Sequence, residues 1–567
     1  MHKKPILVFD RGIFRNEYFW IFILALMLRW LYLWQAFQNN PLIDFPMIDA
    51  NDYINWARQI LAGRFLHQRV TYTPVYPYYL AAIFLFIKNP FWVFALFHVL
   101  GAVQALLLGK IAERVFNRRV GVVTAFLAAT YWPWIVYEAT FHAENFALWT
   151  LILALYLFLR AWDKKPRLWF ISGGLFTLAA LARPNIFLAV PVLLFWLYRA
   201  SPDRRTALSN AVRFATPMIV LVVPLLIYNY QLTGAFMLRD QGMLTLYLGN
   251  NPEFGGLVPR SGLDFRNVLF EPTAHGYFAQ ADQERYWLAK TLRIIQQRFP
   301  EWLVLQGKKL LMNLGSFEIS QEFDIYYYRN HSRVLALFWP GAWLIIPVGL
   351  AGVLLFWRRN RETRWLALLW LALFLSILPG QAASRYRFVM MPLLMLFAGA
   401  FLVEVFRTAA DRRWPELARM LAPVLVFGLV SWPDYLNLHE KNKIYTIYQM
   451  ADKAFNHQRD PELAKKLYAQ SLKLNPEDDN SLYWLAYLAA AEDRHEEARR
   501  YLQDILDRKP NSPDVWWLLA ETYWREGNIE KANDALNRAL TLAPNFNRAL
   551  NLKKRLLLPP MPRQKPK

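Results

Sequence analysis

Residues 18–37, YFWIFILALMLRWLYLWQAF, form a continuous apolar stretch of 20 residues near the start of the chain. A helix of about 20 apolar residues is long enough to cross the hydrocarbon core of a bilayer. The stretch is too long for the core of a signal peptide, and no small-residue cleavage site follows it. We therefore expect it to be a retained first membrane span.

Ten further apolar stretches predict additional spans. They lie at residues 91–114, 120–137, 143–160, 168–183, 185–199, 211–230, 335–357, 365–379, 388–406 and 417–432. The connections on one side hold 20 Lys and Arg residues, whereas the short segments on the other side hold 7. Because basic residues collect in cytoplasmic loops, the N-terminus is predicted to be cytoplasmic. Eleven spans then place the loops 38–90 and 231–334, and the C-terminal part, on the outer face.

Charge divides the chain into two predicted domains. The net charge is +22, but only 19% of residues are charged and 56% are hydrophobic. Charged residues make up about 16% of residues 1–440 and about 31% of residues 441–567. This composition, with 24 Trp, excludes a disordered polyelectrolyte or a nucleic-acid-binding arm, and the absence of cysteine excludes disulfides and thiolate sites. We expect a membrane domain over 1–440 and a water-soluble domain over 441–567.

The soluble domain contains a repeat of 34 residues. Equivalent positions carry alanine or proline, at Ala464, Ala498 and Ala532 and at Pro476, Pro510 and Pro544. A helix–turn–helix unit of this period is typical of tetratricopeptide repeats. The pattern covers about 445–546, followed by a capping helix at 547–557. Three such repeats bury a continuous core and present a concave face that binds a protein partner; a purely scaffolding role is the alternative. The predicted fold class is all-α, a polytopic membrane bundle with a C-terminal α-solenoid.

The first outer loop carries acidic residues directly after a membrane exit. Asp49 and Asp52 open a short helical pattern over 50–62, and a second short segment over 76–87 is also expected to lie at the membrane interface. From these residues alone, the carboxylates could serve only as helix caps. Residues 280–312, in the second outer loop, are expected to form an amphipathic surface helix.

The same loop resembles that of a known family. Asp49, Tyr53, Ala57 and Gly63, followed by residues 72–79, resemble the first outer loop of membrane-integral glycosyltransferases of the GT-C fold. The branch is that of the protein O-mannosyltransferases and lipid A aminoarabinose transferases. Three further stretches support the resemblance, at residues 182–185, 229–252 and 384–387. The likeness runs over about residues 15–435.

The resemblance implies transfer of a sugar from a polyprenyl-phosphate carrier to an acceptor protein or glycolipid outside the cytoplasm. It implies a multi-pass protein of a bacterial cytoplasmic membrane, in contact with membrane lipid. Asp49 is then the catalytic residue, a general base or an orienting group for the acceptor hydroxyl. The departing phosphate needs cationic donors. Candidates for this role are Arg385, Arg387 and Arg183, with Arg69 as a weaker choice, and the expected neighbours in the active site are Asp52, Tyr53, His142 and Glu144.

Metal binding is left open by the sequence. Glu138, His142 and Glu144 could hold a divalent ion, although their spacing is not specific and a hydrogen-bonded loop is the alternative. No other cofactor is implied. The chain also departs from the aminoarabinose branch, because Ala50 replaces an acidic residue and Tyr72-Thr73 replaces a Glu-Lys pair. These changes argue against the aminoarabinose reaction itself.

Two other functions remain as alternatives. One is a polysaccharide polymerase or ligase that uses polyprenyl-diphosphate oligosaccharides, for which arginines of the large outer loop would be essential and Asp49 would not. The other is a non-enzymatic membrane anchor that presents the repeats as a scaffold. A scaffold does not need eleven spans or polar clusters confined to one face.

Overall fold

Helices make up all the regular structure that the computed structural model shows in the part of the chain it describes. That part is residues 16–557, without residues 47, 66–70, 164, 258–261, 338, 433 and 435–437 and without the side chains of 438–441. No strand occurs within it. The expected all-α fold class is confirmed.

The described residues form two compact units. The first, the membrane unit, comprises those up to 241 and those from 300 to 434, and the second, the repeat unit, comprises 242–299 and those from 438 on. The helices of the membrane unit are α1 (Glu17–Asn39), α2 (Ile48–Leu61), α3 (Val75–Phe84), α4 (Pro90–Val115), α5 (Arg118–Thr130), α6 (Trp132–Glu138), α7 (Ala143–Ala161), α8 (Arg167–Ala182), η2 (Pro184–Ala189), α9 (Val190–Ala200), α10 (Arg204–Thr233), α14 (Phe299–Asn313), α15 (Ile325–Asn330), α16 (Arg333–Ala336), α17 (Ala342–Phe356), α18 (Arg361–Ile377), α19 (Ser384–Arg387), α20 (Met391–Ala410) and α21 (Trp414–Ser431).

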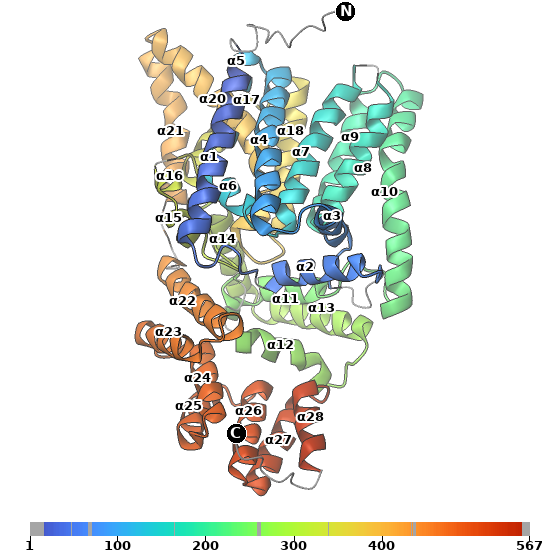
Figure 1. Cartoon of the computed structure of the whole chain (residues 1–567). Coiled ribbons are helices and arrows are strands. Elements are labelled where there is room, and N and C mark those ends of the chain that lie inside the picture. Colours follow the sequence, from blue (N-terminus) through green and yellow to red (C-terminus); the bar gives the residue numbers. More distant parts are fainter. Residues whose placement is uncertain are drawn as a thin grey trace, which may run out of the picture. The chain divides into compact units, whose positions relative to one another are not determined.

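Each of the eleven expected spans coincides with a helix or a pair of helices, and Figure 1 shows these helices standing side by side. Within the described residues, six helices are long and apolar enough to cross a membrane: α1, α4, α7, α10, α20 and α21. The expected span 120–137 is instead the pair α5 and α6, bent by 51° at Tyr131, which would make a seventh. Since the remaining apolar helices are shorter, the count of eleven stays a prediction.

Asparagines define where several of these helices begin. The side chain of Asn16 accepts a hydrogen bond from the Tyr18 amide at 3.1 Å, and Asn89 and Asn117 cap α4 and α5 in the same way. Asn360 forms a capping box with Thr363 at the start of α18. Such caps satisfy backbone amides that lack a partner in the first turn.

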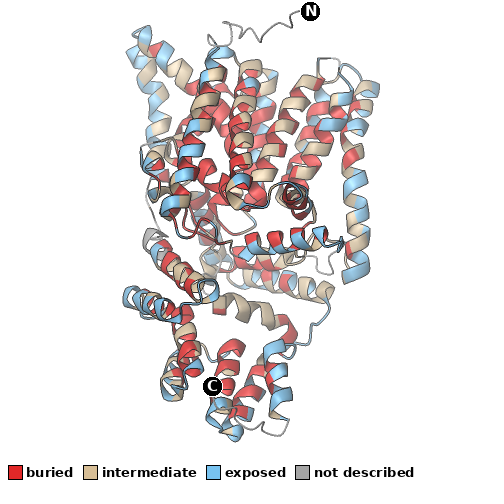
Figure 2. Ribbon diagram, in the orientation of Figure 1, coloured by how far each residue is buried: buried red, intermediate tan, exposed pale blue. Residues whose placement is uncertain are grey.

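Burial differs strongly among the bundle helices (Figure 2). More than half of the most apolar window is buried in α4, α7 and α20, whereas only 11% is buried in α10 and 6% in α21. The exposed residues of α10 and α21 are largely aliphatic. A lipid environment stabilises such a surface, whereas water would not.

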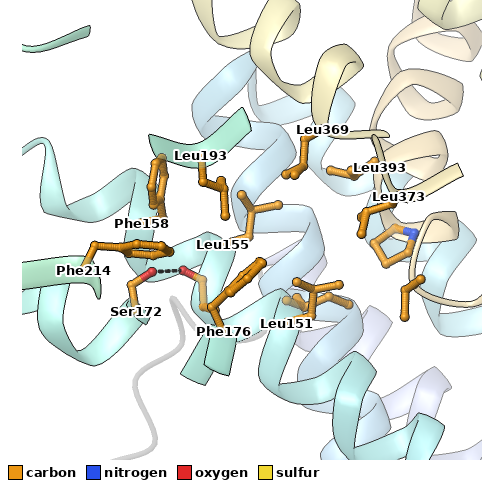
Figure 3. A pocket seen from close by; sticks show the side chains of 14 residues that line it. Leu151, Leu155, Phe158, Ser172, Phe176, Leu193, Phe214, Leu369, Leu373 and Leu393 are labelled. Atoms are coloured by element: carbon orange, nitrogen blue, oxygen red, sulfur yellow. Dashed lines mark hydrogen bonds between the residues drawn. The ribbon is translucent and has the colours of Figure 1, made fainter. Parts of the chain in front are cut away.

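A small apolar cavity lies inside the bundle, between α7, α8, α9, α10, α18 and α20 (Figure 3). Its volume is about 20 Å³, enough for one water molecule. Ser172 is the polar residue in its lining, and the Ser172 hydroxyl is already bonded to the Ala154 carbonyl at 2.8 Å. Without free polar partners a water molecule is not stabilised there, and the volume is too small for a larger ligand.

Glycine allows the close approach of α8 and α10. A Cβ added at Gly173 would collide with the carbonyl of Phe214, whereas one added at the adjacent Gly174 would meet only the Pro217 Cβ at 3.7 Å. We expect Gly173→Ala to destabilise the membrane unit by about 1–3 kcal/mol through overpacking, and Gly174→Ala to leave it unchanged or slightly more stable. Thermal unfolding of the two variants in detergent measures the difference. Equal melting temperatures would contradict this packing.

The repeat unit contains the predicted helix pairs. Its helices are α11 (Gly242–Asn250), η3 (Pro252–Phe254), α12 (Gly262–Ala274), α13 (Gln280–Gln297), α22 (Leu438–Asn456), α23 (Pro461–Leu474), α24 (Asp479–Ala491), α25 (His495–Arg508), α26 (Pro513–Glu526), α27 (Ile529–Leu542) and α28 (Asn547–Leu556). Ala464, Ala498 and Ala532 are fully buried, as the repeat pattern requires. Three pairs and a terminal helix are thus present in this unit.

The second outer loop was the least predictable segment. Residues 242–299 belong to the repeat unit, although they lie some 140 residues before the first repeat in the sequence. The expected single surface helix over 280–312 is wrong, because α13 ends at Gln297 and α14 begins at Phe299. Our expected division of the chain at residue 440 was based on composition, which does not report such contacts, and it stays a prediction.

Candidate active site

The polar residues of the first outer loop lie at one end of the bundle, where α2 lies across the helices (Figure 1). Asp49 is in the first turn of α2, immediately after Ile48. The backbone of Ile48 has φ +42°, a value that β-branched residues rarely adopt. Such strain is found where surrounding contacts hold a functional residue in place. The side chain of Asp49 retains 18% exposure.

Arg385, from α19, is the centre of the cluster. Its Nη1 donates to Asp49 Oδ2 at 3.1 Å and also to Glu322, and its Nε donates to Gln321 Oε1 at 2.7 Å. Glu144 Oε1 lies 3.4 Å from the same Nε. The Arg385 side chain is only 5% exposed, and its guanidinium lies next to three carboxylates that are largely shielded from water. Such buried carboxylates need a nearby positive charge.

Asp49 is held from the other side by Tyr72. The Tyr72 hydroxyl donates to Asp49 Oδ1 at 2.8 Å and lies 3.3 Å from Asp52 Oδ2. Burial raises the pKa of the Asp49 carboxyl, but the charge of Arg385 and the hydrogen bonds with Glu322 and Tyr72 outweigh it, leaving this pKa well below the ordinary aspartate range. Asp49 is therefore a carboxylate at neutral pH.

A second arginine lies close to Arg385. Arg183, at the C-terminal end of α8, pairs with Glu144, and its guanidinium lies 5.3 Å from the centre of the Tyr386 ring. Arg385 lies 5.2 Å from that ring centre. Burial raises the pKa of the Tyr386 hydroxyl, but the charges of Arg385 and Arg183 outweigh it and lower this pKa overall. Tyr386 thus lies beside two cations, Arg183 and Arg385.

The other expected neighbours lie at the edge of the cluster. The Nε2 of His142 is 3.0 Å from Glu322 Oε2, and the Tyr53 ring packs against Tyr72 at 4.7 Å between ring centres. Asp52 is exposed and touches the site through Tyr72. Asp49, Arg183, Arg385, His142 and Glu144, which are far apart in the sequence, are thus linked by contacts. Arg69 lies outside the described residues.

Arg387 has a different environment from Arg385. It pairs with Glu318 at 2.7 Å and donates to the carbonyls of Gly315 and Phe317 at 2.7 and 3.0 Å. Its side chain is 1% exposed. These contacts fix the segment that carries Gln321 and Glu322, so the geometry favours a positioning role. The expected contact of Arg387 with a phosphate stays a prediction.

The suggested metal ligands do not come together. Glu138 accepts two hydrogen bonds from Arg29, at 2.8 and 3.0 Å, and lies 2.9 Å from His98 Nδ1, whereas His142 pairs with Glu322 and Glu144 pairs with Arg183. No group of three or more His, Asp or Glu side chains in the described residues is arranged to hold a metal ion. The metal interpretation of Glu138, His142 and Glu144 is therefore wrong for this arrangement.

Sequence reasoning missed Gln321 and Glu322. Their signal was the acidic run Glu318, Glu322 and Asp324 late in the second outer loop, shortly before an expected span. The run has no motif that would assign it to Arg385, which follows more than 60 residues later. Only the folded chain shows that this segment lies against α19, where the Ser384 amide donates to the Ile319 carbonyl at 3.0 Å.

Models of known families match two separate parts of the chain. A family model described as dolichyl-phosphate-mannose-protein mannosyltransferase matches residues 71–228, and two tetratricopeptide repeat models match residues 448–513 and 489–556. The chain is a glycosyltransferase-like membrane protein with tetratricopeptide repeats. The mannosyltransferase match includes Tyr72, Glu144 and Arg183, but it begins after Asp49 and ends before Arg385.

Some solved structures are distantly similar to this chain. They include the oligosaccharyltransferase of Archaeoglobus fulgidus in its apo form, at 16% identity with TM-score 0.42, over 81% of this chain and 60% of that one. The oligosaccharyltransferase AglB from Archaeoglobus fulgidus, in complex with an inhibitory peptide and a dolichol-phosphate, matches at 15% identity with TM-score 0.41, over 81% of this chain and 60% of that one. This chain thus matches about 60% of the length of those proteins. No curated protein matches its sequence.

Proposed function

We propose that this protein transfers a sugar, a hexose or a pentose, from a polyprenyl-phosphate carrier to an acceptor protein or glycolipid on the outer face of a bacterial cytoplasmic membrane. The observation that carries the proposal is the ionised Asp49 beside a buried Arg385, at the end of a membrane bundle. A carboxylate can accept a hydroxyl proton, and buried guanidinium groups stabilise a phosphate. The mannosyltransferase match over residues 71–228 supports the reaction class.

The proposed reaction exchanges one bond of the anomeric carbon for another and moves one proton. The acceptor oxygen forms a bond to the anomeric carbon of the sugar, the bond between that carbon and the carrier phosphate breaks, and the phosphate oxygen leaves with the electron pair. Asp49 takes the proton of the acceptor hydroxyl. Arg385, with Arg183 next to it, stabilises the negative charge that develops on the leaving phosphate.

The observed pairing suggests how the donor prepares the base. While Arg385 is bonded to Asp49, the carboxylate has a pKa too low for an efficient general base. A donor phosphate would compete with Asp49 for the Arg385 guanidinium. Once that guanidinium turns to the phosphate, Asp49 loses its main stabilising charge and becomes a stronger base. Donor binding would thus precede proton transfer.

Membrane vesicles of known orientation test both the reaction and its side. Right-side-out vesicles that contain the chain are expected to transfer sugar from a polyprenyl-phosphate donor to a membrane-impermeant peptide or glycolipid acceptor. Inverted vesicles should transfer none until detergent opens them, and a protease should digest the repeats only in right-side-out vesicles. The orientation is inferred from the 20 basic residues on the predicted cytoplasmic side.

The same vesicles distinguish the alternatives. Vesicles with Asp49→Asn serve as the matched control for background transfer. Transfer from polyprenyl-diphosphate oligosaccharides alone would support a polymerase or ligase and contradict our proposal. Transfer in sealed inverted vesicles would contradict the orientation.

A further inference from the structure

Helix α12, from the second outer loop, packs on the tetratricopeptide repeats. Four of its residues at positions i, i+3, i+4 and i+7 make these contacts: Leu263, Arg266, Asn267 and Phe270. This spacing places them on one face of the helix. The opposite face, with Phe265, Val268 and Leu269, packs against the core formed by α11 and α13 in the same unit.

Two apolar anchors hold this face. Leu263 is fully buried in the core cluster of the repeats, together with residues of α24, α26 and α27. The Phe270 ring lies 5.1 Å from the ring of Phe546, which precedes α28. Burial of such side chains supplies most of the favourable free energy in a helix-binding groove.

Polar contacts between the anchors set the register. The Arg266 Nε donates to Asp514 Oδ2 at 3.0 Å, where the Asp514 side chain is only 2% exposed, and the Arg266 guanidinium lies 5.7 Å from the centre of the Tyr483 ring. Asn267 Nδ2 donates to Ser512 Oγ at 2.8 Å. Lys509 pairs with Asp264 at 2.5 Å. These contacts make the repeat surface select a helix by its charge as well as by its shape.

The repeat residues involved are equivalent in successive repeats. Asn480, which accepts from the Leu263 amide at 3.4 Å, lies 34 positions before Asp514, and Tyr483 lies 34 positions before Trp517. Asn480 and Asp514 are both in the first turns of the first helices of their pairs, α24 and α26. Corresponding positions of stacked repeats form one continuous surface, which is where solenoids bind ligands.

We propose that this surface is a peptide-binding site and that α12 is its resident ligand. The repeats thus hold a segment of their own chain, with the pattern leucine, arginine three residues later and phenylalanine four after that. A protein partner of the repeats must present the same pattern on a helix and displace α12. The inference concerns the repeat unit alone and does not depend on the proposed transferase activity.

Intramolecular docking makes the site selective. A tethered ligand acts at an effective concentration set by its tether, and a free partner must bind more tightly than this concentration allows α12 to bind. A partner that displaces α12 also releases the helix that α11 and α13 pack against in the second outer loop. Partner binding and the conformation of that loop are therefore coupled.

Cross-linking of the full-length protein in detergent tests the docking. The chain has no native cysteine, so Asn267→Cys with Ser512→Cys supplies a single reactive pair. We expect a short bis-maleimide to join the two positions within one chain. The two single-cysteine variants are the controls, because neither can form this link. Adding Leu263→Asp should slow this cross-link at least about tenfold, because it places a carboxylate in a buried apolar site. Adding Arg266→Lys, which keeps the charge, should slow it much less.

A peptide-binding experiment then decides whether α12 is an exchangeable ligand or a permanent part of the core. A labelled peptide of residues 262–274 is expected to bind the full-length Leu263→Asp variant, whose repeat surface is unchanged and vacated, and not the unaltered protein at the same concentration. Asp514→Arg in the Leu263→Asp background should abolish that binding. Limited proteolysis should show intact repeats in every variant. Absence of the cross-link, absence of peptide binding, equal binding to both proteins, or unfolding of the repeats in both Leu263→Asp and Arg266→Glu would each overturn the proposal.

Discussion

Replacement of Asp49 by asparagine is expected to lower sugar transfer by a factor of about 10² to 10⁴, the usual contribution of a positioned general base. The amide has nearly the size of the carboxyl, and its oxygen can still accept the hydrogen bond that Tyr72 donates at 2.8 Å. It cannot take a proton from the acceptor. The loss should therefore appear in kcat, and donor binding should not weaken, because asparagine competes less than aspartate with the donor phosphate for Arg385. Initial rates in the vesicle assay measure both effects.

Asp52→Asn is the matched control for this substitution. Asp52 lies one turn further along α2, is exposed, and is 3.3 Å from the Tyr72 hydroxyl. Its replacement should change the rate less than about threefold, as is common for exposed surface residues. If Asp49→Asn retains full activity, or if both substitutions inactivate equally, Asp49 is not the base.

The pH dependence gives an independent check on Asp49. Because the pKa of Asp49 is depressed in the free protein, its ionised form persists as the pH falls from neutrality and is lost only below the ordinary aspartate range. The profile of kcat/KM, which reports the free protein, should accordingly show no loss assignable to Asp49 on the acidic side near neutrality.

The sequence predicts the order of the membrane helices because long apolar stretches are a local signal. Hydrophobicity does not reveal where a stretch bends. The break at Tyr131 comes two residues before Pro133, which has no backbone N–H to bond the carbonyl of Ala129 in a continuous helix but fits the first turn of a new one. The bend between α5 and α6 could therefore have been anticipated. The strongly exposed α10 and α21 were recognisable as apolar helices, but not as the least buried ones.

The site was predictable only in part. Asp49, Arg183 and Arg385 were singled out through a family resemblance, and the structure brings them together around Glu144 and Tyr386. Glu322 and Gln321 were missed because their pairing with Arg385 depends on contacts between distant parts of the chain. The packing of α12 on the repeats was missed for the same reason, since one face of a short helix does not identify the surface it covers.

Replacement of Arg385 by glutamine is expected to have the largest effect on the membrane unit, in stability and in activity. Glutamine removes the positive charge next to Asp49 and Glu322 at a site where the arginine is 5% exposed, whereas Glu144 keeps its pairing with Arg183. Removing one partner of a buried ion pair typically costs about 3–5 kcal/mol. We expect a strongly lowered melting temperature in detergent and no measurable transfer.

A second substitution separates these two effects. In Arg385→Gln with Glu322→Gln, one of the three carboxylates is removed together with the cation, so much of the lost stability should return. If Arg385 binds the leaving phosphate, the double variant stays inactive despite its recovered fold, because no charge replaces the guanidinium. If Arg385 only maintains the fold, transfer returns together with the melting temperature. That second result would contradict a phosphate-binding role for Arg385 and leave Arg183 as the remaining buried cation beside Tyr386 among the residues that the structure describes.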